Sequence, residues 1–326
     1  MSKKEVLFHK FSSNLSSLAE KIAPLKKLIP ERGRYICPLA LTVHKSSCLN
    51  EGSVNQLSLE HVPPEAMGGK AICLIRKDIN SIFGHTVDNK VLQTIKARRF
   101  FKGESSIRGR VSFNLQRLQH IHANITILPG DVVNIVIDPG AKNMGLVEKE
   151  ITNKGIWAGL QQQLSFSVPV KSDMEFKAAL LRYAYLKAFA VFGYALIFGP
   201  KKFINPHYEI IRQQILSPQE QIIPFIPVFI NVNIPFEGVG VVTSPEEMKS
   251  FISMFPLNLE GKIDYCSVFL PAPDDRGFSA YSFCHNNIGN AKQLNLQVRQ
   301  IIPIQLDDPK AAFFPYHIWK NLNGVL

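Results

Sequence analysis

The first regular pattern in the chain is helical and lies within residues 5–30. Apolar residues recur there at spacings of three and four, at Phe8, Phe11, Leu15, Leu18, Ile22 and Leu25. This period places one apolar stripe along a helix, and Pro24 and Pro30 end it. We expect residues 1–33 to form an amphipathic N-terminal helix that packs on the rest of the protein or on a partner.

Between residues 34 and 105 the pattern changes from strand to helix. Leu57–Val62 and Ala71–Arg76 are short β-like runs, and the prolines and glycines between them exclude a helix there. Asp78 suits the N-cap of a helix that runs from Ile79 to Arg99. The expected order is strand, loop, strand, helix.

Residues 106–326 are expected to form a larger mixed region. Its predicted strands are Arg110–Leu115, Ala123–Leu128, Val132–Ile137, Phe225–Ile234, Val239–Val242, Ile263–Leu270, Phe278–Phe283 and Leu294–Ile304. Glu175–Phe198 is the strongest helical segment, and Pro245–Phe255 is predicted to be a second helix. The fold class is therefore α+β, with a long buried helix and a β-rich C-terminal part.

The long helix is expected to lie in the core and not in a membrane. Its apolar run is broken by Arg182 and Lys187, and its longest uncharged part, Ala188–Pro200, is too short to span a bilayer. The chain opens on a mixed polar segment without an apolar leader. Its five cysteines are too few for a disulfide framework in 326 residues. We expect a cytoplasmic protein without a membrane partner.

Positive charge is concentrated near the N-terminus. Residues 1–110 hold 19 Lys and Arg against 9 Asp and Glu, whereas residues 111–326 hold 18 against 17. Lysine and arginine supply most of the non-specific affinity for nucleic acid because they release counterions from phosphates. The asymmetry favours a polyanionic partner. A solvated basic surface or a membrane-facing patch is the alternative.

Three residues of the 34–105 range carry candidate chemistry. Glu60 and His61 are adjacent at the end of the first predicted strand, and Asn80 lies near the start of the predicted helix. A carboxylate and an amide oxygen suit a hard cation such as Mg²⁺ or Mn²⁺, and histidine commonly acts as a general base. Neighbours on an ideal strand point to opposite faces, so Glu60 and His61 need not share a ligand.

The wider pattern resembles the HNH (His-Asn-His) nuclease superfamily with its ββα-metal fold, in particular the branch E-H-V-P-P…G-G…N-x-x-x-G-H-x-x-D. The matching positions are Glu60, His61, Pro63, Pro64, Gly68, Gly69, Asn80, Gly84, His85 and Asp88. The resemblance covers roughly residues 35–90. A weaker likeness to longer members continues in Ala178–Leu186 and Ile211–Leu216.

The resemblance implies a metal-dependent endonuclease that acts on DNA rather than RNA. It implies that Glu60 and Asn80 hold Mg²⁺ or Mn²⁺ and that His61 activates water. His85 and the helix cations Lys96, Arg98 and Arg99 are expected to contact phosphates, although such a run can equally be a solvated face.

The chain departs from the family at the zinc-binding cysteines. Cys37 matches the first of them, but its partner position is Ala40, and the second pair falls on Arg76 and Ile79. Ser81 replaces the second asparagine of the usual doublet. We therefore expect no structural zinc. A rearranged site is the alternative, although its spacings lack the tight pairs of known sites; its members would be Cys37, His44, Cys48 and Cys73.

Two other functions remain open at this stage. The module can be a catalytically inactive nucleic-acid-binding or regulatory protein built on the same scaffold. Alternatively, residues 106–326 can sense a ligand or partner and gate a nuclease. The sequence also leaves open a homo-oligomer or a regulatory protein partner.

Overall fold

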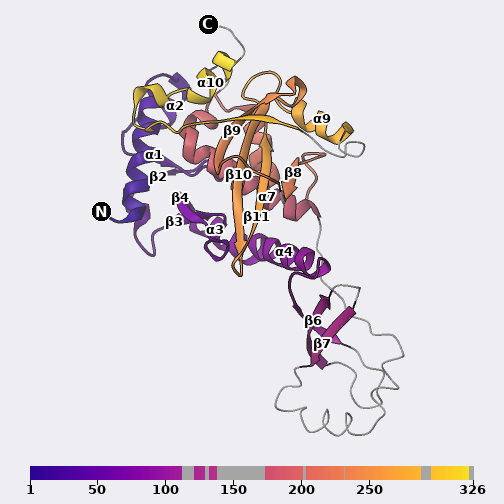
Figure 1. Cartoon of the computed structure of the whole chain (residues 1–326). Coiled ribbons are helices and arrows are strands. Elements are labelled where there is room, and N and C mark those ends of the chain that lie inside the picture. Colours follow the sequence, from indigo (N-terminus) through magenta and orange to yellow (C-terminus); the bar gives the residue numbers. More distant parts are fainter. Residues whose placement is uncertain are drawn as a thin grey trace, which may run out of the picture. The chain divides into compact units, whose positions relative to one another are not determined.

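The computed structural model describes residues 1–111, 121–128, 132–137, 173–200, 203–230, 232–287 and 295–322, which form an α+β fold (Figure 1). The chain divides into two compact units, Met1–Asp88 with Asp173–Leu326, and Asn89–Ser172. This division differs from the expected ranges 1–33, 34–105 and 106–326. The difference arises because the segment after Asp173 packs back onto the elements that precede Asp88.

The N-terminal pattern forms two helices, α1 (Lys3–Ala19) and α2 (Ala23–Leu28). A capping box between Ser2 and Glu5 begins α1. The apolar stripe of α1 is buried, and Phe11 stacks on Phe189 with ring centroids 4.7 Å apart. The N-terminal segment is therefore a packing element of the first unit.

The two predicted strands are confirmed as β3 (Leu57–Val62) and β4 (Lys70–Arg76), an antiparallel pair that we call the motif hairpin. A one-turn 3₁₀ helix, Glu65–Met67, lies in its loop. The other short elements before it are β1 (Tyr35–Ile36), β2 (Val43–His44) and a 3₁₀ helix at Ser46–Leu49.

The helix after the motif hairpin begins two residues earlier than predicted. Helix α3 spans Lys77–Phe83 and continues through a π-helical turn, Gly84–Asp88. Asp78 does not cap it, because its carboxylate accepts hydrogen bonds from the Arg76 guanidinium. Single π-helical turns often occur at functional sites.

The Gly-Gly pair of the motif is a steric requirement of the hairpin loop. Gly68 has a φ of +79°, in the left-handed region. A Cβ on Gly69 would lie 1.4 Å from the carbonyl oxygen of Pro63. The loop can therefore close only when residue 69 has no side chain.

The predicted core helix is α7 (Asp173–Phe192), which ends in a 3₁₀ helix, Gly193–Leu196. It covers one face of a five-stranded antiparallel sheet, behind the strands in Figure 1. The strand order is β12-β9-β10-β11-β8, with bounds β8 (Val228–Ile230), β9 (Gly238–Ser244), β10 (Ser250–Leu259), β11 (Lys262–Leu270) and β12 (Gln297–Gln300).

Two predictions for the C-terminal part are wrong. Pro245–Phe255 is not a helix: a 3₁₀ helix, Glu246–Met248, leads into β10, which pairs with β9 and β11 on either side. Phe278–Phe283 is not a strand but enters α9 (Ser279–Asn287). In the first case, pairing with the preceding and following strands overrides the local preference.

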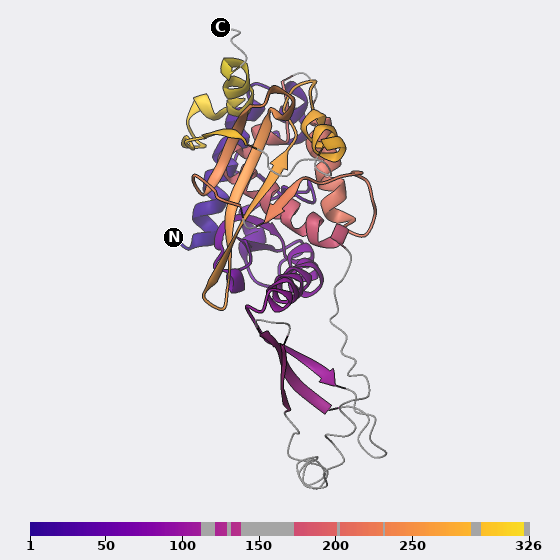
Figure 2. The same cartoon turned by 45° about the vertical axis from the view of Figure 1, so that its right-hand side comes forward.

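The remaining elements of the first unit are α8 (Pro206–Leu216), a 3₁₀ helix at Pro309–Ala311 and α10 (Phe314–Leu322). The hairpin of β10 and β11, orange in Figure 2, reaches the loop of the motif hairpin. A Cβ on Gly68 would lie 3.3 Å from the Cβ of Asn258, near the tip of β10. The C-terminal sheet therefore supports the motif directly.

The second unit contains α4 (Asn89–Phe101) and a three-stranded antiparallel sheet in the order β5-β6-β7. The strands are β5 (Ile107–Val111), β6 (Ile121–Leu128) and β7 (Val132–Ile137). Most of the strand predicted at Arg110–Leu115 lies outside the described residues. In neither unit do the described helices include one that is long and apolar enough to cross a bilayer.

Replacement of Gly69 by alanine should destabilise the protein by about 3 kcal/mol or more, because its Cβ would overlap a backbone oxygen. Gly84→Ala is the matched control, since Gly84 has helical torsions and open space around it. We expect the Gly84→Ala variant to be as stable as the unmodified protein, or more stable by up to about 1 kcal/mol. Urea denaturation measures both, and equal stabilities would refute the steric account.

Candidate active site

Asn80 joins helix α3 to strand β3. Its Nδ2 atom donates two hydrogen bonds of 2.9 Å, to Ser58 Oγ and to the carbonyl oxygen of Leu59. Because alternate residues share a face of a strand, Ser58 and Glu60 lie on the same face of β3. The helix thus brings an amide to the face that carries Glu60.

The Glu60 side chain is buried, 2 % exposed, beside an arginine and a second carboxylate. Arg182 Nη2 lies 3.7 Å from Glu60 Oε1 and also forms an ion pair with Asp88 Oδ1. The hydroxyl of Tyr183 donates to the same Asp88 oxygen at 2.6 Å. The Arg182 guanidinium lies over the ring of Phe83, with Cζ 4.5 Å from the centroid. We call these five residues the Arg182 cluster.

Burial raises the pKa of Glu60 from 4.5 to about 7, and Asp88 adds to this effect, whereas Arg182 opposes it. The pKa of Arg182 moves upward although burial lowers it, because Glu60 and Asp88 favour its charged form. The pKa values of Glu60 and Arg182 can both be raised, because Arg182 pairs at short range with Asp88 and lies farther from Glu60. The pKa of Glu60 therefore lies near neutral pH.

His61 lies at an irregularity of the motif hairpin. The register shifts between Glu60 and His61, so that His61 pairs with Ala71 while Glu60 pairs with Cys73. The His61 side chain is half-buried and follows Glu60, a member of the Arg182 cluster, in the chain. It therefore remains the histidine nearest in sequence to the candidate carboxylate.

The four residues predicted to contact phosphates belong to different units of the chain. His85 is exposed on the π-helical turn of the first unit. Lys96, Arg98 and Arg99 lie on α4 of the second unit, where Arg98 is exposed, Lys96 is half-buried and Arg99 is only 4 % exposed. Of the three helix cations, Arg98 presents the most surface to solvent.

The oxygen donors fit a hard divalent cation in chemical type. Glu60 Oε1 is buried and has no hydrogen-bond partner within the described part of the chain. Both of these hydrogen bonds of the Asn80 amide come from its nitrogen, so its Oδ1 would be the atom offered to a cation. Mg²⁺ keeps several waters and needs few protein oxygens, but Glu60 Oε1 is buried and faces the Arg182 guanidinium at 3.7 Å.

The alternative zinc set is engaged in other interactions. His44 Nε2 hydrogen-bonds with Thr42 Oγ1 at 2.7 Å, and Cys37 Sγ accepts from the Ala40 amide at 3.4 Å. Cys48 Sγ lies 3.9 Å from the carbonyl oxygen of Val54. Within the described ranges, no three His, Cys, Asp or Glu side chains are arranged to hold a metal. The Glu60 carboxylate and the Asn80 amide are a different set of donors from these cysteines and histidine.

Sequence reasoning missed Arg182, Tyr183 and Asp88 as members of the site. A signal was present, because Arg182 interrupts an otherwise apolar helix, and a buried arginine requires an acidic partner. The sequence does not indicate which carboxylates pair with Arg182. Here they come from β3 and from the π-helical turn.

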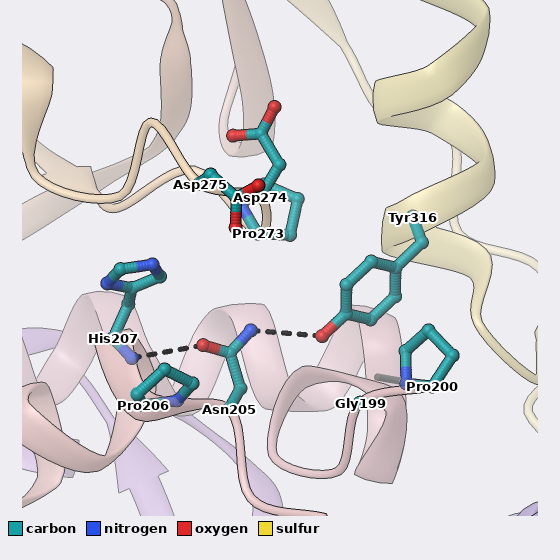
Figure 3. A pocket seen from close by; sticks show the side chains of 9 residues that line it. All are labelled: Gly199, Pro200, Asn205, Pro206, His207, Pro273, Asp274, Asp275 and Tyr316. Atoms are coloured by element: carbon teal, nitrogen blue, oxygen red, sulfur yellow. Dashed lines mark hydrogen bonds between the residues drawn. The ribbon is translucent and has the colours of Figure 1, made fainter. Parts of the chain in front are cut away.

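A separate pocket of about 240 Å³ lies at the start of α8 (Figure 3). Asn205 Oδ1 accepts from the amide of His207 at 3.0 Å, and its Nδ2 donates to Tyr316 Oη at 3.0 Å. Asp274 accepts from Trp319 Nε1 at 2.5 Å. The buried Asn205 amide thus connects the walls of this pocket. In this it differs from the buried atoms at Glu60 that have no hydrogen-bond partner in the described part of the chain.

Comparison with known proteins identifies no relative: no family model, no curated protein and no solved structure matches this chain. The resemblance to HNH nucleases therefore depends on the motif residues themselves.

Stability should fall as pH rises from 4.5 through about 7, because folded Glu60 retains a proton that the unfolded chain has released. The shift corresponds to about 3 kcal/mol. Glu60→Gln cannot titrate, so the stability of this variant relative to the unmodified protein should improve by about that amount between pH 4 and pH 8. Urea denaturation in chelator at each pH measures the difference, and parallel pH profiles would contradict the assignment.

Proposed function

We propose that the protein is a cytoplasmic, metal-dependent endonuclease that hydrolyses phosphodiester bonds, in DNA rather than RNA. The observation that supports this proposal is the contact of the Asn80 amide of α3 with β3, at Ser58 Oγ and the carbonyl oxygen of Leu59, in the strand that also carries Glu60 and His61. A buried carboxylate oxygen without a hydrogen-bond partner and an amide oxygen are the donors that a hard cation takes.

Each residue has a distinct role in this proposal. His61 takes the proton of the attacking water as general base. Glu60 and Asn80 would hold Mg²⁺ or Mn²⁺, which when bound supplies a Lewis acid for the phosphoryl and leaving oxygens. The basic surplus of residues 1–110 provides the attraction for the phosphate backbone.

One observation favours a second candidate, a nucleic-acid-binding protein without catalytic activity. The Arg182 guanidinium lies 3.7 Å from Glu60 and already supplies positive charge to it. A cation brought to the same carboxylate must overcome repulsion from that guanidinium. On this view the hairpin and the charge surplus bind nucleic acid, and Glu60 serves only the fold.

His61→Ala should abolish Mg²⁺- or Mn²⁺-dependent nicking of supercoiled DNA while leaving DNA binding nearly unchanged. A general base acts in the transition state and contributes little to ground-state affinity. Its loss typically costs about 10²–10⁴-fold in rate. His9→Ala, at an exposed histidine of α1, is the matched control and should nick at the unmodified rate.

Two outcomes would contradict the proposal. Nicking that survives His61→Ala at full rate would place the active site elsewhere. No nicking by the unmodified protein with DNA or RNA and either metal, together with retained binding, would favour the second candidate.

Nucleic-acid binding by the full chain should weaken steeply with salt, because it depends on phosphate contacts. Lys96→Gln with Arg98→Gln should reduce the slope of log K against log salt by about 2 on duplex DNA if each contacts one phosphate. Lys262→Gln with Arg299→Gln removes the same charge from the balanced C-terminal region and is the control. Equal slopes for the two double variants, measured by fluorescence anisotropy, would exclude the α4 cations from the interface.

A further inference from the structure

Most of the net positive charge of the chain belongs to its second unit, Asn89–Ser172. This unit holds 12 Lys and Arg against 5 Asp and Glu, a surplus of 7 in 84 residues. The first unit holds 25 against 21, a surplus of 4 in 242 residues. A small unit with this density of positive charge suits a polyanionic partner.

The register of the β5-β6-β7 sheet divides its residues between two faces. Arg108 pairs with Asn124, which pairs in turn with Val136, and Arg110 pairs with His122. Paired residues share a face of a sheet, as do alternate residues of one strand. One face, which we call the polar face, therefore carries three apolar residues and all the polar residues of the three strands, namely Arg108, Arg110, His122, Asn124, Thr126 and Asn134. The residues of the other face are isoleucine, valine, alanine and glycine alone.

The exposure of the side chains agrees with this division. Ile125, on the apolar face, is fully buried, whereas Asn124 and Asn134 are exposed. Val136, the partner of Asn124 on the polar face, is 57 % exposed. The polar face is therefore open to solvent at these positions, and the apolar face belongs to the core of the second unit.

The composition and width of the polar face suit duplex DNA better than a single strand. Single-stranded nucleic acid is usually bound by aromatic side chains that stack on its bases, and the described strands place no Phe, Tyr or Trp on this face. Neighbouring strands lie about 4.8 Å apart, so the axes of three strands span about 10 Å. The major groove of DNA is about 12 Å wide and admits β-structure. Arginine and asparagine are also the residue types that bond to guanine and adenine there.

We infer that the polar face of the β5-β6-β7 sheet is a binding surface for duplex DNA. Arg108 and Arg110 supply positive charge for the phosphates, and the exposed amides of Asn124 and Asn134 supply hydrogen-bonding groups. This inference rests on the proposed function only for its nucleic-acid partner. It requires no cleavage, so it holds equally for the second candidate.

The test introduces negative charge at two exposed positions of the polar face. Asn124→Asp with Asn134→Asp should weaken binding of the full chain to a fluorescently labelled DNA duplex at least about tenfold in low salt, because carboxylates repel phosphates. Asn286→Asp with Asn287→Asp makes the same change at exposed asparagines of α9 in the first unit. This control should change the affinity by less than about twofold, since exposed charges far from the DNA are screened. Fluorescence anisotropy measures both affinities.

A second variant, Arg108→Gln with Arg110→Gln, adds no negative charge. If each arginine contacts one phosphate, the slope of log K against log salt on the duplex should decrease by about 2. Lys262→Gln with Arg299→Gln, in the first unit, removes the same charge and should leave the slope unchanged.

The inference fails if the two aspartate double variants bind the duplex equally well. It also fails if the substitutions on the polar face weaken binding to single-stranded DNA but not to the duplex. Where Asn124→Asp with Asn134→Asp does not fold, an unchanged salt slope in the arginine variant overturns the inference. None of these outcomes concerns cleavage, so nicking by the unmodified protein tests the proposed function separately. No binding of the unmodified protein to any nucleic acid would overturn both.

Discussion

Helix α7 is buried along most of its length, so a charged side chain at its centre has no access to water. Arg182 must therefore find its partners inside the protein. They come from two other places, Glu60 on β3 and Asp88 at the end of the π-helical turn. The arrangement of the motif hairpin, the helix after it and the core helix depends on this charge balance as well as on apolar packing.

The parts of the fold that could be predicted from sequence are those with local causes. The motif hairpin follows from its loop, where Gly68 needs a left-handed torsion and Gly69 has no room for a side chain. Strand β10 could not be predicted in the same way, because pairing with β9 and β11 decides it. The local pattern indicated a helix there, and pairing with the two neighbouring strands prevailed.

The residues of the candidate site also differ in whether a local sequence pattern identifies them. Glu60, His61 and Asn80 are recognisable because motif spacing is a local property, and Asn80 does lie against β3. The pairing of Arg182 with Asp88 spans the whole second unit in sequence, since the chain leaves the first unit at Asp88 and returns at Asp173. An arginine within an apolar helix indicates that a partner exists, but only the folded structure identifies that partner.

The charge around Arg182 also bears on which function the site has. Two carboxylates face one guanidinium, which leaves one negative charge that a proton or a cation must neutralise at low cost. Glu60 accepts a proton near neutral pH, with its pKa raised to about 7 by burial. A divalent cation at Glu60 would compete with this proton, because metal ligands must be deprotonated. In a protein that only binds nucleic acid, Glu60 would serve the fold as a partner of the buried Arg182. Binding of a divalent cation at Glu60 therefore distinguishes the two candidate functions.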